Sequence, residues 1–104
     1  MENLDITRLD QGRAGEYHAQ LPGSDAVARL TWIARGAAGQ DSEAPVRVIE
    51  HTLVPREYEG RGIAGRLVAA LIEDARAQGF RIEPQCSYVA AQFRRHPEWG
   101  DLLA

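Results

Sequence analysis

The chain contains no lysine, and all 12 of its basic residues are arginine, against 15 acidic residues and a formal net charge of −3. Without lysine the protein cannot form a Schiff base or use a lysine nucleophile. It also has no Walker-type lysine with which to hold a phosphate. The mildly acidic balance argues against general nucleic-acid binding, which needs an excess of clustered positive charge. We therefore expect no nucleic-acid partner.

Cysteine is almost absent, because Cys86 is the only one in the chain. A single cysteine cannot form an internal disulfide, which fits a reducing compartment. No apolar run approaches the ~20 residues of a membrane-spanning helix, and the N-terminus lacks the layout of a signal peptide. We expect a cytoplasmic protein with no membrane partner. One cysteine and three scattered histidines offer no paired ligands, so we also expect no metal.

A length of 104 residues, 44% of them hydrophobic, suits one domain with one core. The first dozen residues are polar and turn-like, so we predict no strand there. Alternating or β-branched patterns predict three strands, over residues 16–21, 26–34 and 46–54. Short turns between them favour antiparallel pairing, with a hairpin loop over 36–43.

A helical pattern begins at the glycine-rich segment that starts at Gly60. Apolar side chains recur every four residues from Ile63 to Ala75, and Gly79 is a typical helix stop. A strand over 80–83, a helix over 88–95 and a tail that caps the core follow. A helix joining strands 46–54 and 80–83 makes them parallel neighbours with a right-handed crossover. The predicted class is α/β (α+β), with antiparallel N-terminal strands, a β-α-β parallel pair and a short C-terminal helix.

The loop from Gly60 to Gly65 reads G-x-G-x-x-G, and Glu83 ends the next predicted strand. This matches a dinucleotide-binding fingerprint. However, residues 55–59 separate the loop from the preceding strand, and only 21 of the 104 residues follow Glu83. That length is too short for the further units of a doubly wound sheet, so we reject this interpretation.

The same loop retains the physical features of an anion site. Glycines leave backbone N–H groups accessible, and the unpaired donors at a helix N-terminus favour a negative charge. Arg56 and Arg61 flank the loop and can pair with phosphate oxygens. We predict a phosphate-binding loop, and the alternative is a turn that only starts the helix.

Four segments of the chain resemble a known family. They are His51-Thr52-Leu53-Val54-Pro55, Gly60-Arg61-Gly62-Ile63-Ala64, Pro84-Gln85-Cys86-Ser87-Tyr88-Val89 and His96-Pro97-Glu98. From about Glu16 to the C-terminus, the chain resembles the small, YjdJ-like branch of the GCN5-related N-acetyltransferases. The resemblance implies a single acetyltransferase domain over residues 1–104. Its acyl donor would be acetyl-CoA, and its acceptor an amine of unknown identity on a small molecule or a protein.

The resemblance also implies that the coenzyme lies in a V between the splayed parallel strands. Backbone groups at the end of the first strand would bind the pantetheine arm, and the loop amides would hold the pyrophosphate. With the flanking arginines, the expected coenzyme-binding residues are Leu53, Val54, Arg56, Gly60, Arg61, Gly62, Ile63, Ala64 and Gly65.

The chain departs from the family pattern at three positions. Leu53 stands where a glutamate is usual, and Glu59 stands where an arginine usually precedes the first loop glycine. Phe93 falls near the tyrosine that is the general acid of larger relatives. These departures favour an alternative function, a non-catalytic acyl-CoA-binding or protein-interaction module.

Four side chains are candidates for the chemistry itself. Cys86 precedes the short helix, whose N-terminal donors can lower the pKa of its thiol, and it can accept the acyl group or protonate the leaving thiolate. His51 can act as a general base, or Glu50 through a water, and alternation along the strand places the two on opposite faces. Tyr88 can supply a proton. The alternatives are core packing for Cys86 and Tyr88, and a hydrogen-bonded core histidine for His51.

Overall fold

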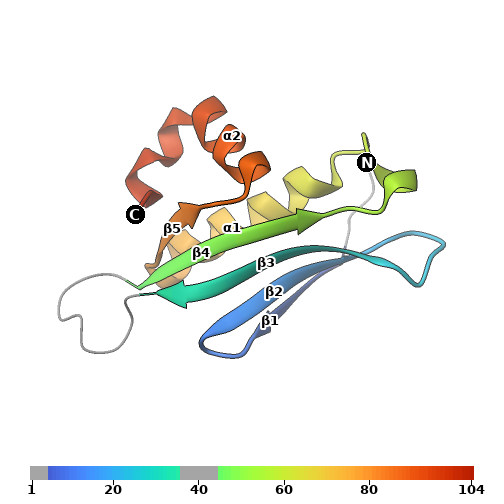
Figure 1. Cartoon of the computed structure of the whole chain (residues 1–104), viewed down its shortest axis with the longest axis horizontal. Coiled ribbons are helices and arrows are strands. Elements are labelled where there is room, and N and C mark those ends of the chain that lie inside the picture. The colour runs from blue at the N-terminus through green and yellow to red at the C-terminus, as the bar shows by residue number, and fades with distance from the viewer. Residues whose placement is uncertain (1–4, 36–44) are drawn as a thin grey trace.

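The computed structural model describes residues 5–35 and 45–104, and every structural statement below concerns those residues. Five strands form one sheet in the order β1-β2-β3-β4-β5. They are β1 (Ile6–Asp10), β2 (Ala14–Gln20), β3 (Val27–Arg35), β4 (Val46–Leu53) and β5 (Arg81–Pro84). The first four pair antiparallel and β4 pairs with β5 in parallel (Figure 1). The antiparallel pairing of β2, β3 and β4 and the parallel pair of β4 and β5 were predicted. The expected loop over 36–43 lies outside the described residues.

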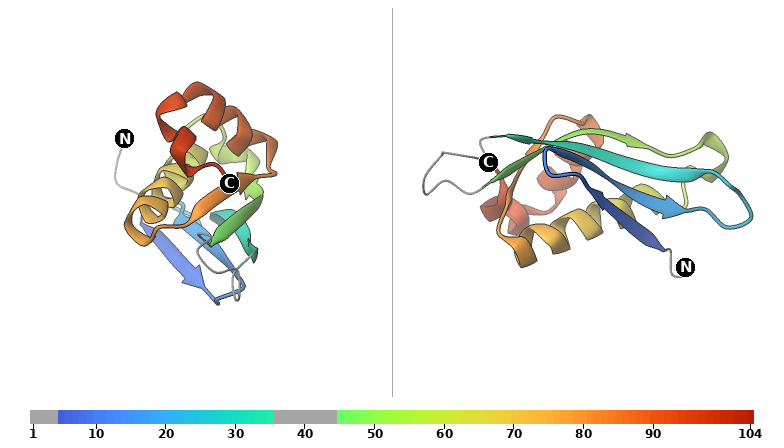
Figure 2. Two further views of the ribbon diagram at one scale, coloured as in Figure 1. Left: turned by 90° about the vertical axis from the view of Figure 1, so that its left-hand side faces the viewer. Right: turned by 90° about the horizontal axis from the view of Figure 1, so that it is seen from below.

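Four helical segments complete the fold: η1 (Arg56–Tyr58), α1 (Ile63–Gln78), α2 (Ser87–Arg95) and η2 (Pro97–Leu102). α1 covers one face of the sheet, whereas α2 and η2 pack at its β5 side (Figure 2). The tail caps the core as predicted, because Leu102 is buried and Leu103 forms a bridge with Ile82. Within the described residues, no helix is long and apolar enough to cross a membrane.

The prediction that the first dozen residues contain no strand is wrong, because β1 occupies residues 6–10. Four of its five residues are exposed, so the strand carries almost none of the apolar alternation that marks a half-buried strand. Its pairing with β2 and the contacts of Arg8 with α1 hold it in place instead.

The core lies between α1 and the sheet face that it covers. On β3, alternation places Ala28, Leu30 and Trp32 on the inward face, and all three are buried. α1 contributes the fully buried Leu67 and Leu71. It ends at Gly79, whose φ of 82° is the left-handed conformation that glycine adopts at helix C-termini.

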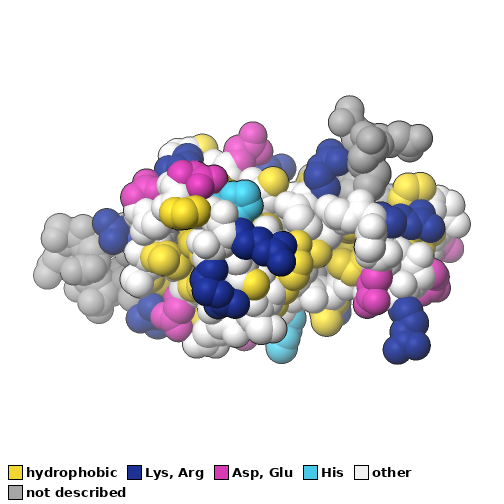
Figure 3. Space-filling model, turned by 90° about the horizontal axis from the view of Figure 1, so that it is seen from above, with side chains coloured by type: hydrophobic (Ala, Val, Ile, Leu, Met, Phe, Trp, Pro, Cys, Tyr) yellow, Lys and Arg dark blue, Asp and Glu magenta, His cyan; other side chains and the backbone are white. Residues whose placement is uncertain are grey.

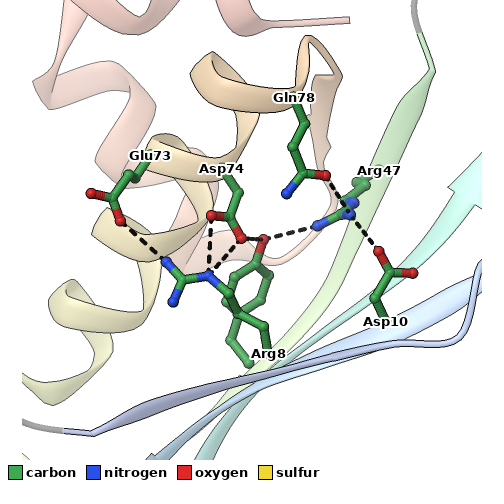
Figure 4. A network of polar contacts seen from close by, with 7 residues as sticks. Arg8, Asp10, Arg47, Glu73, Asp74 and Gln78 are labelled. Carbon is green, nitrogen blue, oxygen red and sulfur yellow. Dashed lines mark hydrogen bonds and ion pairs between the residues drawn. The ribbon is translucent and has the colours of Figure 1, made fainter.

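A buried polar network crosses the same interface near the C-terminal end of α1 (Figure 4). Asp74 accepts hydrogen bonds from Arg8 Nε at 2.9 Å and from the Tyr17 hydroxyl at 2.9 Å. Arg47 Nη1 donates to the same hydroxyl at 2.9 Å. The Arg47 guanidinium lies between the rings of Trp32 and Phe80, at 3.9 and 4.1 Å from their centroids. This arrangement pairs the buried charges, which would otherwise be costly.

A β-bulge interrupts β4 at the level where β4 and β5 stop pairing. Thr31 of β3 pairs with His51 and Trp32 pairs with Ile49, so Glu50 is the extra residue. Among the described residues, Thr31 Oγ1 is the one buried side-chain polar atom without a hydrogen-bond partner. Regular alternation along the strand had predicted that Glu50 and His51 point to opposite faces. The bulge breaks this alternation, so that prediction does not hold.

Candidate active site

β4 and β5 separate immediately after the pair Ile49–Pro84, where their ladder ends. The backbone N–H groups of Gln85 and Cys86 both donate to the Ile49 carbonyl, at 3.1 and 3.0 Å. These two bonds turn the chain away from β4, which continues to Leu53 with no strand on that side. The result is the splayed pair of parallel strands that the family resemblance implied.

A pocket of about 510 Å³ lies in this gap. It is lined by the end of β4, the loop before α1, the first residues of α1 and one side chain of α2. The lining residues are Thr52, Leu53, Val54, Tyr58, Glu59, Gly60, Gly62, Ile63, Ala64 and Tyr88. Seen from above, apolar side chains lie between arginine-bearing surfaces on either side (Figure 3).

The loop before α1 takes the shape that its glycines permit. Gly60 and Gly62 have φ of 82° and 80°, a backbone region that other residues rarely adopt. Gly62 is the N-cap of α1 and offers no side chain to cap it. The first backbone N–H groups of the helix therefore face the pocket region without a capping side chain, an arrangement that favours an anionic ligand.

Cys86 lies beside this pocket at the N-cap of α2. Its thiol is partly buried and donates to Thr52 Oγ1 at 3.5 Å. Burial raises the pKa of Cys86, but the contact with Thr52 and the backbone N–H groups of Val89 and Tyr88 outweigh it, so the net pKa is lowered. The predicted effect of the helix N-terminus on this thiol is confirmed in direction.

Tyr88 projects from α2 into the pocket, and its side chain is 36% exposed. A Cβ added at Gly65 would lie 3.7 Å from the Tyr88 hydroxyl, so this hydroxyl lies over the first turn of α1. Packing of Tyr88 in the core is therefore excluded. Phe93, which the resemblance places near the tyrosine acid of larger relatives, is buried and packs edge-on against Trp99.

Glu50 and His51 lie apart from this pocket. Glu50 lines a different pocket, with Glu16 and Thr31, on the face of the sheet opposite α1. His51 is exposed and pairs with the same Thr31, so the core-histidine alternative is wrong. The bulge therefore places both side chains next to Thr31.

The pocket contains six of the nine residues expected to bind the coenzyme, and Arg56, Arg61 and Gly65 do not line it. Three lining residues were not among the predicted site residues: Thr52, Tyr58 and Glu59. The sequence could have indicated Thr52, because the residues that follow it in the strand were already predicted to bind the coenzyme. It indicated Tyr58 less clearly, through an aromatic side chain placed three residues before Arg61. Within residues 5–35 and 45–104, no group of three or more His, Cys, Asp or Glu side chains is arranged to hold a metal.

Comparison with solved structures supports the fold assignment. The chain is similar to an aminoglycoside acetyltransferase, meta-AAC0020, from an uncultured soil metagenomic sample, solved with sisomicin and with trehalose. For the sisomicin complex the TM-score is 0.63 at 23% identity, covering 83% of this chain and 57% of that one. For the trehalose complex the TM-score is 0.63 at 22% identity, covering 91% of this chain and 68% of that one. No curated protein matches the chain.

A family model provides the assignment. The model of the GCN5-related N-acetyltransferases, in its CG-type form, matches residues 16–102, which is most of the chain. This confirms the resemblance carried by the strand, loop and Pro-x-Cys-x-Tyr segments, and it agrees with the parallel pair β4 and β5. The chain belongs to the GCN5-related N-acetyltransferase family.

Proposed function

We propose that the protein transfers the acetyl group of acetyl-CoA to an amine. The observation that carries this proposal is the pocket at the end of β4, past the point where β4 and β5 stop pairing, which runs to the N-terminus of α1. The pantetheine arm would lie along Leu53 and Val54. Its pyrophosphate would lie at the loop amides from 61 to 65, with Arg56 and Arg61 beside it.

The reaction needs two proton transfers. The amine nitrogen, once neutral, attacks the thioester carbonyl, the carbon–sulfur bond breaks, and the CoA thiolate takes a proton. Tyr88 and Cys86 lie at the pocket and beside it, so we assign protonation of the thiolate to one of them. Glu50 and His51, next to the bulge, are the candidates to take the proton of the ammonium.

A covalent route is an alternative use of Cys86. Its thiolate would attack the thioester, release CoA as a thiolate, and then pass the acetyl group to the amine. Its lowered pKa and its contact with Thr52 support this route. If Cys86 is required, as an acid or as an acyl acceptor, Cys86→Ala should abolish acetyl transfer. The affinity for acetyl-CoA should remain unchanged. Full turnover by this variant would leave Cys86 a packing residue and Tyr88 the acid.

The acceptor is an amine whose identity we leave open. The similar meta-AAC0020 protein was solved with sisomicin, so aminoglycosides belong in the panel to be tested. The chain spans 57% of that protein's length, and the regions absent here are places where acceptor specificity can reside. Small polyamines and peptide N-termini complete the panel.

The test is release of free CoA thiol in the presence of each amine. We expect release that depends on the amine and is lost in the Cys86→Ala or Tyr88→Phe variant. A second function has one observation in its favour: Glu59, a carboxylate, lines the pocket that would hold the phosphates. Binding of acetyl-CoA without thiol release for any amine would support a non-catalytic acyl-CoA-binding module.

A further inference from the structure

We propose that Tyr58 is a positioning residue that holds the Arg61 guanidinium for the phosphates of the coenzyme. The Arg61 guanidinium carbon lies 4.8 Å from the centroid of the Tyr58 ring. A guanidinium over an aromatic face is attracted to it, so its rotamers are restricted before a ligand arrives. This inference rests on the proposed coenzyme site.

The charge of Arg61 is available to a ligand. Arg61 takes part in none of the ion pairs found among the described residues, whereas Arg8, Arg47 and Arg76 each pair with a carboxylate. Those three arginines stabilise the fold. Among the described residues, the side chain of Arg61 lies over an aromatic ring and has no ion-pair or hydrogen-bond partner, so its N–H donors are available to an anion.

Tyr58 itself is fixed at both ends. Its ring is partly buried and packs against the hydrophobic core. Its hydroxyl donates to the Pro22 carbonyl at 2.7 Å, which ties η1 to the turn between β2 and β3. Figure 1 shows this turn beside the segment that follows β4. A ring held in this way is a rigid platform for a flexible arginine.

The need for such a platform follows from Glu59. This carboxylate lines the same pocket as Tyr58 and repels a phosphate. An arginine that is already oriented loses less conformational entropy on binding, so it offsets this repulsion more effectively than a mobile one. The Tyr58–Arg61 pair therefore supplies what the usual arginine at position 59 would supply.

A double-mutant cycle on acetyl-CoA affinity tests the proposal, using Tyr58→Leu, Arg61→Ala and the double variant. We expect Arg61→Ala to weaken binding about tenfold and Tyr58→Leu about fivefold, and the double variant to bind about as weakly as Arg61→Ala. Tyr58→Phe keeps the ring and loses only the bond to Pro22, so its loss should be about twofold at most. Thermal unfolding of each variant checks that it folds.

A purely structural role for Tyr58 predicts other results. The two losses would then multiply in the double variant, and Tyr58→Leu would weaken acetyl-pantetheine, which lacks the phosphates, as much as acetyl-CoA. Either result overturns the positioning role while leaving the coenzyme site intact. A wild-type protein that binds neither compound would overturn the proposed function, and this inference with it.

Discussion

At the scale of single residues, the proposed chemistry depends most on the surroundings of the Cys86 thiol. The sequence placed it before a helix, and the structure adds a contact that the sequence did not indicate, with Thr52 Oγ1 at 3.5 Å. Thr52 comes from β4 and Cys86 from the start of α2, so the contact depends on where the two parallel strands separate. A pattern along the chain cannot show such a contact.

The lowered pKa of Cys86 gives a prediction for its alkylation. Because contacts with Thr52 and the N–H groups of Val89 and Tyr88 outweigh the effect of burial, the thiolate forms at lower pH than in a free cysteine. The rate of iodoacetamide alkylation should therefore reach half its maximum below the pH that a small thiol requires. Thr52→Val should move this midpoint upward. Identical midpoints in the variant and the wild type would show that Thr52 has no such effect.

A second residue-scale prediction concerns Tyr17, whose pKa is raised, first by burial and then by its hydrogen bond to Asp74. The native state then holds this proton more tightly than the unfolded state, whose tyrosine titrates near 10.0. Its contribution to stability is full below that pH. Above it, stability falls by up to ~1.4 kcal/mol per pH unit. No lysine titrates in this range to obscure the effect.

The Tyr17→Phe variant separates the titration of Tyr17 from other causes of pH-dependent stability. At neutral pH the variant should lose ~1–3 kcal/mol of unfolding free energy, because Arg47 and Asp74 each lose a buried partner. Its stability should then fall less steeply above pH ~10 than that of the wild type. Urea unfolding at several pH values measures both. Parallel curves for the two proteins would contradict the raised pKa.

At the scale of elements, the sequence predicted the helices and strands whose apolar residues recur with a regular period. It did not predict the features that depend on hydrogen-bonded pairing between strands. The bounds of α1 and the order from β2 to α2 follow from apolar spacing and from Gly79 and Pro97. β1 was missed because its residues are exposed and its stability comes from β2 and from Arg8. The bulge at Glu50 was missed because it is a mismatch between two strands, which neither strand shows alone.

Gly15 tests the packing of these elements. A Cβ there would lie 2.4 Å from the Trp32 ring and 2.3 Å from the Leu9 carbonyl oxygen, so three neighbouring strands would have to move. Gly15→Ala should lower the free energy of unfolding by about 1–3 kcal/mol or more. Gly100→Ala is the matched control, because its added Cβ meets no atom within 4 Å and its φ is not positive. Equal stability of the two variants in urea would contradict this packing.

At the scale of the whole molecule, the described residues form one five-stranded sheet, a core between this sheet and α1, and a pocket of about 510 Å³ at the end of β4. The fold and family were predictable because each loop and strand segment that carries the family resemblance is continuous in the sequence. The acceptor was not predictable, because recognition of an acceptor depends on segments far apart in the sequence that meet only in the folded protein.

The lack of lysine gives a prediction at this scale. The protein cannot acetylate itself on a lysine side chain, so any self-acetylation must appear at the N-terminus, at a hydroxyl or as a thioester on Cys86. The covalent route predicts that intact mass after acetyl-CoA treatment shows an adduct that hydroxylamine removes and that Cys86→Ala lacks, whereas direct attack by the amine predicts no such adduct. An adduct that resists hydroxylamine and persists in Cys86→Ala would contradict a thioester on Cys86.

The measurement that tests the central claim most directly is a calorimetric titration of the protein with acetyl-CoA. The pocket at the end of β4 and the loop before α1 predict saturable binding at one site per chain, weakened by Arg61→Ala. Unchanged binding of acetyl-CoA by Arg61→Ala would place the phosphates elsewhere. No heat of binding up to high micromolar acetyl-CoA, with the protein folded, would contradict the coenzyme site itself.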